Sequence, residues 1–598
     1  MKYARPAILL ALAIGSVASA LPIHESSVAA ASSGQTSITH LAYTGASTLR
    51  SQAGSGGGTG MGTSLEIGPQ PRLDQQTSHS QNAAHVPAAH VPTPDGNNVT
   101  SANPGFAGFN GLSHRDQRLA GTGRYTNTQF SLEPPDQGLC VGNGFVVEGV
   151  NNALQVFTTS GAAATAPAAF SQFWNLNPEV TRSNPPVYGD FISDPKCYYD
   201  ATTHRFFLTE LQISTDPATG AFMAPSHVLI AVSTTNDPTA MWNRYSIDTT
   251  DNGSNGTPPN AGCPCFGDQP LIGADANGFY VTTNEFSLAT SQFNGAQVYA
   301  LSKSALEAGT LPPVVHIGNL SLAEGAAYSI QPATVPGGGS FETVNGGTEY
   351  FLSALDFNAT RDNRIAIWAL ANTSSLNSPE PSVSLTNAVI GSEVYGQPPD
   401  AQQRPGPTPL ADSLKDHLEL IAGNDDRMNQ VVFAGGKLWS GVNTVVKTQN
   451  GPTRVGIAYF IVTPSSASGQ AAGTIANQGY VAVNQENVMY PSIGVNAAGK
   501  GVMAFTLVGP DYYPSAAYAP IDAINGVGAV HIAGAGSGPD DGFTGYRAYG
   551  GNGTGRWGDY SAAVADSDGS IWTAAEYIPN APRTILANWG TFISHVTP

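Results

Sequence analysis

The chain has 598 residues, only 11% of them Asp, Glu, Lys or Arg, and its formal net charge is −19. Globular proteins usually carry about 25% of these residues. The negative field would repel nucleic acid and no basic stripe is present, so we exclude a nucleic-acid partner. The same composition suits an acidic medium, a hypothesis that unfolding in mild acid would contradict.

The first 20 residues have the pattern of a secretory signal peptide. Lys2 and Arg5 precede a short apolar run at 7–17, and residues 18–20 form an Ala-Ser-Ala cleavage site. No later stretch reaches the length of about 18 uninterrupted apolar residues that a membrane span needs. We therefore expect a secreted protein, extracellular or periplasmic, without a membrane span.

Residues 21–103 are rich in Ser, Gly, Ala, Thr and Gln and show neither apolar alternation nor a helical period. We predict a disordered linker or pro-segment here. From residue 104 to 598, short alternating apolar runs broken by turn residues predict strands throughout. This part is expected to be one all-β domain.

A unit of strand, turn and second strand recurs in this domain at intervals of about 70 residues, longer than WD40 or kelch repeats. Its openings lie at Asp136, Asp194, Asp268, Gln331, Asn429, Pro491 and Asp559. We predict a single seven-bladed β-propeller with long loops. An eighth blade in the long interval after Gln331 remains an alternative.

The last unit is short of one strand. After Asp559 only about three strands fit before Pro598. We expect residues 124–132 to supply the fourth strand, because joining both ends of the chain hides two sheet edges.

An even number of cysteines in an exported chain favours disulfides, and the four here allow three pairings: Cys140, Cys197, Cys263 and Cys265. We favour Cys140–Cys197 between neighbouring blades and Cys263–Cys265 around Pro264. A Cys-x-Cys metal site is the alternative, although it lacks nearby His ligands.

Residues at equivalent openings should form a ring at the mouth of the central channel. Four carboxylates then follow one side, Asp136, Asp194, Asp268 and Asp559. The opposite side carries Gln331, Asn429 and Tyr490, and the flanks carry Arg427 and Arg556.

Three interpretations of this ring stay open. In the structural one, each Asp hydrogen-bonds the backbone of its own turn. In the second, Asp136, Asp194 and Asp268 hold Ca²⁺ or Mg²⁺. In the third, the ring is catalytic, because close carboxylates shift each other's pKa and give the acid and the base of glycoside hydrolysis. The catalytic set would be Asp136, Asp194, Asp268, Asp559, Tyr490 and Tyr560, with Arg427, Arg556, Asn429 and Gln331 binding substrate.

The stretches Arg-Trp-Gly-Asp-Tyr-Ser at 556–561, Asp-Asp-Arg at 425–427 and Tyr-Pro-Ser-Ile at 490–493 resemble exported bacterial propellers of the sialidase-like or BNR-repeat group. The resemblance covers roughly residues 105–598, and it implies a fold and export but no single activity. Sialidases need three arginines around the substrate carboxylate, whereas only Arg427 and Arg556 lie at openings here. Sialidase activity is therefore not carried over.

These observations predict an extracellular, monomeric propeller that binds or hydrolyses a glycan at its acidic channel mouth. The alternative is a non-catalytic surface or matrix protein that binds partners through its loops. The sequence contains no nucleophile elbow in a strand-to-helix context, no H-E-x-x-H motif and no dinucleotide fingerprint.

Overall fold

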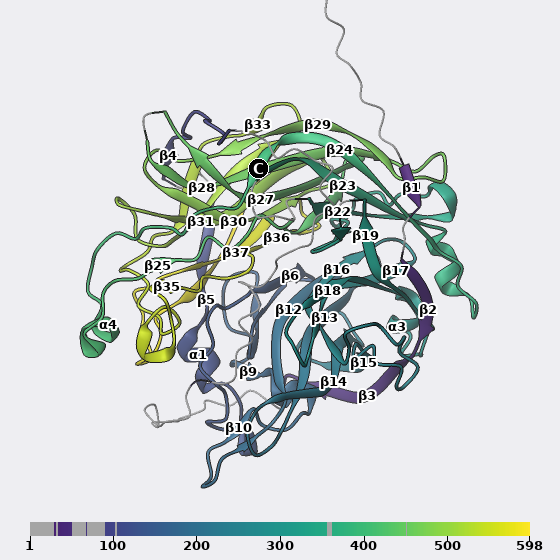
Figure 1. Cartoon of the computed structure of the whole chain (residues 1–598), viewed down its shortest axis with the longest axis horizontal. Coiled ribbons are helices and arrows are strands. Elements are labelled where there is room, and N and C mark those ends of the chain that lie inside the picture. The colour runs from purple at the N-terminus through teal and green to yellow at the C-terminus, as the bar shows by residue number, and fades with distance from the viewer. Residues whose placement is uncertain are drawn as a thin grey trace, which may run out of the picture.

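The computed structural model describes residues 29–31, 34–50, 67, 90–101, 105–323, 325–355, 361–449 and 451–598. This part of the chain is all-β, as predicted, and its helices are short: α1 (His114–Leu119), α2 (Phe170–Trp174), α3 (Lys303–Glu307) and α4 (Pro409–Leu414) (Figure 1). None of the described helices is long and apolar enough to cross a membrane. The predicted signal peptide at 1–20 lies outside the described residues.

The strands follow one another as antiparallel meanders of four, each of which we call a unit. The first three units are β6 (Gly138–Gly142), β7 (Phe145–Val150), β8 (Ala153–Thr158), β9 (Ala168–Ala169); β12 (Phe191–Asp200), β13 (Arg205–Thr215), β14 (Phe222–Ser233), β15 (Met241–Asp248); and β16 (Cys265–Ala274), β17 (Gly278–Ser287), β18 (Phe293–Ser302), β19 (Val314–Leu322). The next two are β21 (Gln331–Thr334), β22 (Thr348–Ala354), β23 (Arg361–Ala371), β24 (Ser384–Gly396); and β26 (Val431–Ala434), β27 (Lys437–Lys447), β28 (Thr453–Ser465), β29 (Ala472–Val481). The last two are β30 (Asn487–Val495), β31 (Lys500–Val508), β32 (Ser515–Asp522), β34 (Val530–Gly534); and β36 (Ala562–Ala565), β37 (Ile571–Tyr577), β38 (Gly590–Val596), β5 (Ala107–Ser113).

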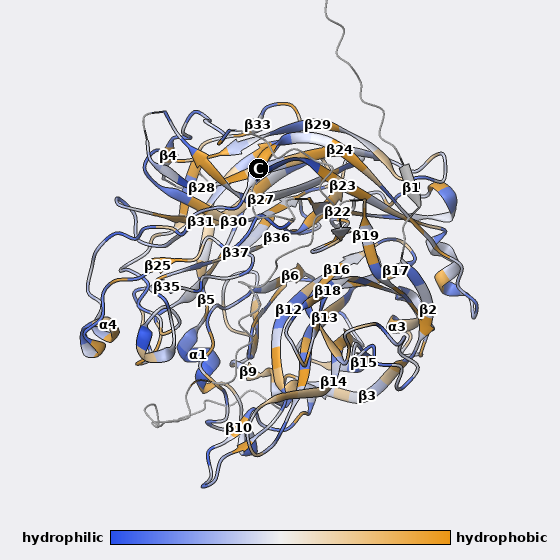
Figure 2. Cartoon of the chain, viewed as in Figure 1, coloured by the Kyte–Doolittle hydropathy of each residue, from blue (hydrophilic) through white to orange (hydrophobic). Residues whose placement is uncertain are grey.

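The innermost strands of the units contact one another in a closed cycle, which runs β6, β12, β16, β21, β26, β30, β36 and back to β6. Apolar side chains fill the space between neighbouring units. Phe207 and Phe279 stack with ring centroids 4.9 Å apart between the second and third units. The rings of Tyr350 and Phe433 are tilted against each other, with centroids 5.7 Å apart, between the fourth and fifth. In Figure 2 the apolar residues follow the strands, whereas α1 is hydrophilic.

An earlier segment of the chain completes the last unit, as predicted. The segment is β5 and not the predicted residues 124–132. β5 pairs with β38, whereas residues 124–132 begin with a 3-10 turn, η1 (Gly123–Tyr125), and hydrogen-bond the loop after α2. Glu148 fixes the closing strand, because its carboxylate accepts from the backbone N–H of Leu112 at 2.8 Å and from Thr591 Oγ1 at 2.5 Å. The sequence prediction missed β5 because its residues are mostly small.

The prediction of disorder for 21–103 is wrong for several described stretches. β1 (Ala29–Ala31), β2 (Gln35–Thr39) and β3 (Leu41–Thr48) pair with the outer strands β24, β19 and β15, and β4 (Val99–Thr100) pairs with β34. Figure 1 shows β2 and β3 in purple along the outer rim. A strand that covers an open edge is held by backbone hydrogen bonds, so it needs no apolar alternation of its own. The stretches 21–28, 32–33, 51–66, 68–89 and 102–103 of this prediction lie outside the described residues.

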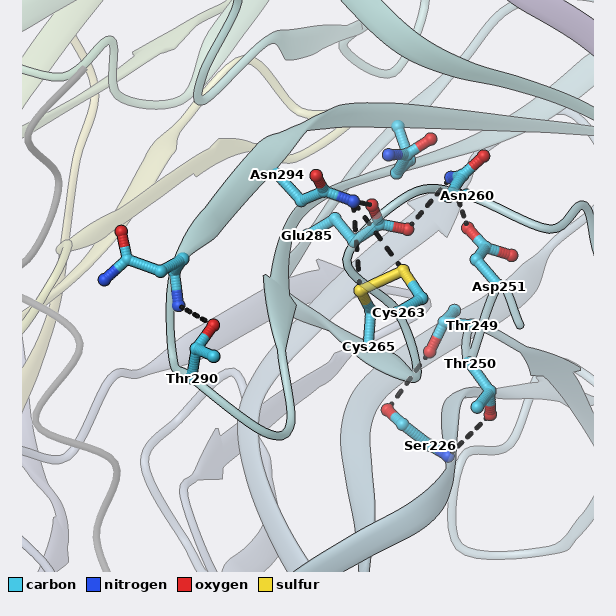
Figure 3. Close-up of a disulfide and its surroundings, with 12 residues drawn as sticks. Ser226, Thr249, Thr250, Asp251, Asn260, Cys263, Cys265, Glu285, Thr290 and Asn294 are labelled. Carbon is cyan, nitrogen blue, oxygen red and sulfur yellow. Dashed lines mark hydrogen bonds between the residues drawn. A yellow bond between two sulfur atoms is a disulfide. The ribbon is translucent and has the colours of Figure 1, made fainter. Parts of the chain in front are cut away.

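Both favoured disulfides are present. Cys140–Cys197 joins the innermost strands β6 and β12 of neighbouring units. Cys263–Cys265 closes a loop at the start of β16 (Figure 3).

Between the units, short strands tie the long loops together. β10 (Val180–Thr181) pairs with β11 (Val187–Tyr188), and β25 (Leu420–Ile421) runs parallel to β35 (Thr554–Gly555). The second pairing brings the loop before β26 against the loop before β36.

Candidate active site

The openings of three innermost strands share one backbone feature. The pairing register shifts by one residue at Ser193/Lys196 in β12, at Asp268/Leu271 in β16 and at Met489/Ser492 in β30. In each bulge a residue with positive φ precedes a proline: Asp194 (59°), Gln269 (49°) and Tyr490 (61°). Such bulges redirect side chains, and strained residues of this kind concentrate at functional sites.

Three aspartates meet where the last, first and second units adjoin. Asp136, Asp194 and Asp559 each place a carboxylate oxygen within 4.8 Å of the other two. All three residues are buried, with exposed fractions of 1%, 5% and 8%. We call them the acidic triad.

Asn151 fixes two members of the triad. Its Nδ2 donates to Asp136 Oδ2 at 2.9 Å, and its Oδ1 accepts from the backbone N–H of Asp194 at 2.9 Å. The backbone N–H of Asp559 donates to the other oxygen of Asp136 at 2.7 Å. Both carboxylate oxygens of Asp136 therefore accept hydrogen bonds that hold the site together.

The Asp559 carboxylate is surrounded by donors. Gln269 Nε2 donates to Oδ2 at 2.8 Å and Asn424 Nδ2 donates to Oδ1 at 2.9 Å. Arg556 Nη2 lies 3.9 Å from Oδ2. Arg427 contacts Asp559 only through Gln269, since its Nη1 donates to Gln269 Oε1 at 2.7 Å. Both predicted arginines thus lie around the triad.

Burial governs the electrostatics of the site. It raises the pKa of Asp136 well above the usual carboxyl value, and the neighbouring Asp559 adds to the effect. It also raises the pKa of Asp194, with Asp268 as the next cause. Lys196 lies with its ammonium over the ring of Tyr560, and burial lowers the pKa of this lysine to about 7. Burial and the surrounding aspartates raise the pKa of Tyr560.

We expected Asp136, Asp194 and Asp268 to form the metal site. In the structure, Asp559 takes the place of Asp268 in the triad. The equivalent of Asp194 in the third unit is Gln269, one residue beyond the predicted opening at Asp268. A shift of one residue turns a side chain to the other face of a strand. Asp268 therefore stays beside the triad, close enough to raise the pKa of Asp194.

The predicted polar residues on the opposite side support a loop. Gln331 Nε2 donates to the carbonyl of Met428 at 2.9 Å, and Tyr490 Oη donates to that of Ala422 at 2.6 Å. Asn429 Nδ2 donates to the carbonyl of Arg427 at 3.3 Å. These bonds hold the segment 422–428 in place. The segment positions Asn424 beside Asp559, and Arg427 beside the Gln269 that contacts Asp559.

A second group of buried acids, missed in the sequence, lies under the long loops: Glu133, Glu419, Asp540 and Asp541. Burial and the neighbouring Asp540 raise the pKa of Glu419 to about 11. Glycine makes room for the group, since a Cβ on Gly545 would lie 1.5 Å from Glu419 Oε2. The only hint in the sequence is the pair Asp540-Asp541 inside a glycine-rich run.

Glu576 lies between the two acidic groups. It is buried, and its pKa is raised by burial and then by Asp540 and Asp136. The acidic triad is therefore part of a larger buried network of acids.

A cavity lies along the innermost strands. Gln137 and Lys196, which line it, follow Asp136 and Asp194 by one and two residues. Gln331, Gln430 and Ala562 line it from other units. The triad thus lies beside the end of this cavity.

Carboxylate oxygens are the ligands that Ca²⁺ and Mg²⁺ prefer, so the triad could hold such an ion. Lys196 and Arg556 already supply positive charge beside it, and both act on the pKa of Asp194. Among the described residues, the other group with suitably close ligand atoms is Cys263, Cys265 and Glu285.

No family model and no curated protein matches the chain. Among solved structures, it is similar to a leech intramolecular trans-sialidase, with 10% identity over 67% of each chain and a TM-score of 0.35. It is also similar to a protein of unknown function from Dyadobacter fermentans, with 10% identity over 68% of this chain and 94% of that one and a TM-score of 0.31. An α-L-arabinanase from Penicillium chrysogenum matches at 11% identity over 67% of this chain and 92% of that one, with a TM-score of 0.25.

Proposed function

We propose that the chain is a secreted, monomeric, seven-bladed β-propeller that hydrolyses a glycan at the acidic mouth of its central channel. The closed cycle of innermost strands, with four strands in each unit, supports seven blades. The signal-like residues 1–20 and the two disulfides support export.

The observation that carries this proposal is the contrast between Asp194 and Asp559. Burial raises the pKa of Asp194, which suits a general acid that protonates the leaving oxygen. Asp559 instead receives two amide donors and faces Arg556, which suits a carboxylate that attacks the sugar or stabilises positive charge on it. Two carboxylates in opposite environments are what glycoside hydrolysis requires.

We further propose a retaining reaction. One oxygen of each carboxyl group lies within 4.8 Å of one oxygen of the other, and retaining enzymes hold their two carboxyl groups roughly 5–5.5 Å apart. Asp559 would then form the glycosyl intermediate, and Asp194 would activate the water that releases it.

Other residues of the site have supporting roles in this proposal. Asp136 is a positioning residue, because its carboxylate holds the backbone of Asp559. The Arg556 side chain is 28% exposed and can contact substrate, whereas the Arg427 side chain is 8% exposed and orients Gln269. Lys196, whose ammonium lies over the ring of Tyr560, lines the cavity.

The test is a panel of neutral and acidic polysaccharides, with released reducing ends and bound polymer measured for each protein. We expect release by the wild type and at least a hundredfold loss in Asp194→Asn and Asp559→Asn, the low end of what general acid catalysis contributes. Asp511→Asn, at an exposed aspartate, is the matched control. Binding without release in every protein would instead support the non-catalytic alternative.

A further inference from the structure

The two disulfides of the chain are of different kinds. Cys140–Cys197 spans 57 residues, whereas only Pro264 separates Cys263 from Cys265. A disulfide restrains the unfolded chain less as its loop becomes shorter, so the second one adds little as a structural crosslink.

The two sulfurs of the short loop differ in access. Cys263 is half-buried, and Cys265 is completely buried. In the longer disulfide both cysteines are buried. Thiol–disulfide exchange begins at a sulfur that the attacking thiolate can reach, which here is Cys263.

A buried carboxyl group lies beside both sulfurs (Figure 3). An oxygen of Glu285 is within 4.8 Å of Cys263 Sγ and Cys265 Sγ. Asn294 Nδ2 lies 3.6 Å from Cys263 Sγ and 3.9 Å from Cys265 Sγ, and it donates to Glu285. Asn260 Nδ2 donates to the other oxygen of Glu285 at 3.2 Å. Glu285 is thus held where it can pass a proton to a sulfur.

Burial favours the protonated carboxyl group of Glu285. It raises the pKa of Glu285, although the hydrogen bonds with Asp251, Asn260 and Asn294 act in the opposite direction. Burial and Glu285 itself raise the pKa of Asp251, joined to it through Asn260, to about 9. His316 Nε2 lies 3.7 Å from Asp251, and burial lowers the pKa of this histidine to about 4.

We propose that Cys263–Cys265 is a redox-active disulfide that exchanges with external low-molecular-weight thiols. A thiolate attacks Cys263 Sγ, the S–S bond breaks, and its electron pair passes to Cys265 Sγ, which takes the proton of Glu285. A second thiolate attacks the mixed disulfide, releases Cys263 as a thiolate that is then protonated by water, and leaves as the external disulfide. Two thiols are oxidised, the protein disulfide is reduced, and Glu285 regains its proton from solvent.

The test uses the full-length folded protein in glutathione buffers of graded ratio, with alkylation and peptide mass spectrometry. We expect Cys263 and Cys265 to become reduced while Cys140–Cys197 stays oxidised as the control within the same chain. Reduction of both pairs together, or of neither until the chain unfolds, would overturn the proposal.

Single-residue variants distinguish the exchange reaction from effects on the stability of the fold. Cys265→Ser should accumulate glutathione on Cys263, whereas Cys263→Ser should react at least about tenfold more slowly at the buried sulfur. Glu285→Gln should slow reduction by about tenfold or more at neutral pH with the adduct still on Cys263. An adduct on Cys265 in the wild type or in Glu285→Gln, or an unchanged rate in Glu285→Gln, would contradict the mechanism.

Discussion

The backbone N–H of Asp559 donates a 2.7 Å hydrogen bond to Oδ1 of Asp136, although 423 residues separate them. This bond joins the last unit to the first, and Asn151 extends the connection to Asp194 in the second. The contacts that close the ring of strands therefore also position the acidic triad. A change that weakens the closure should disturb the candidate site as well.

Replacing Asn151 tests this link. Asn151→Ala leaves the buried backbone N–H of Asp194 and one oxygen of Asp136 without their partner. Each such loss costs about 1–3 kcal/mol, so we expect the free energy of unfolding to fall by about 3 kcal/mol. Urea unfolding monitored by fluorescence measures it. Asn236→Ala, at an exposed asparagine, is the control, and equal stability of the two variants would disprove the link.

Stability should fall as pH rises from mildly acidic to neutral. Burial raises the pKa of Glu148 from 4.5 to about 7. Below pH 4.5 this group is protonated in the folded and unfolded chain alike. Between the two values only the folded chain keeps the proton, so the free energy of unfolding falls by about 1.4 kcal/mol per pH unit. Glu179 shifts in the same direction and to the same value.

We therefore expect a higher melting temperature at pH 5 than at pH 8, which agrees with the acidic habitat inferred from composition. Glu148→Gln should remove its share of the pH dependence, about 3 kcal/mol over the full window. Glu380→Gln, at an exposed glutamate, should leave the dependence unchanged. A melting temperature that rises towards pH 8 would show that the buried acids do not govern stability.

The N-terminal strands should keep the protein monomeric. Deleting residues 29–48 removes β2 and β3 and exposes the edges of β19 and β15. Open edges pair with other chains, so we expect association or aggregation in sedimentation experiments. Deleting residues 68–89 removes a similar length and leaves the residues of β2 and β3 in the chain. Identical behaviour of both deletions would refute an edge-covering role.

The longer disulfide should dominate covalent stabilisation. Loss of Cys140–Cys197 in a double Ser variant should cost about 4 kcal/mol, given the 57-residue separation, and loss of Cys263–Cys265 about 1 kcal/mol. Urea midpoints of the two double variants give the comparison. A larger loss from the Cys263/Cys265 variant would mean that the short disulfide is a structural crosslink.

The repeated openings made the fold predictable from the sequence, because a polar or proline-flanked start precedes each innermost strand and coincides with a bulge in β12, β16 and β30. They placed Asp136, Asp194 and Asp559 together, and they located both arginines. The predicted opening at Asp268 is one residue away from the bulge. Only the pairing with β17 reveals that Gln269 occupies the bulge. Alternation of apolar residues cannot detect a bulge, which shifts the register without changing composition.

Other parts of the site had no signal to detect. Glu133 and Glu419 lie in loops outside any repeat motif, and Glu576 lies on β37, so the three come together only in the folded chain. β5 and the N-terminal strands are rich in small and polar residues, since their pairing depends on an edge supplied by another unit. Their structure is decided by tertiary contacts that local sequence does not encode.

The most direct test of the central claim is the hydrolysis of a glycan by the wild type and by Asp194→Asn at the pH of maximal activity, followed by NMR of the released anomer. The account predicts retention of configuration in the wild type and at least about a hundredfold slower release in the variant. Equal rates in the two proteins, or an inverted product, would contradict the assignment of Asp194 and Asp559.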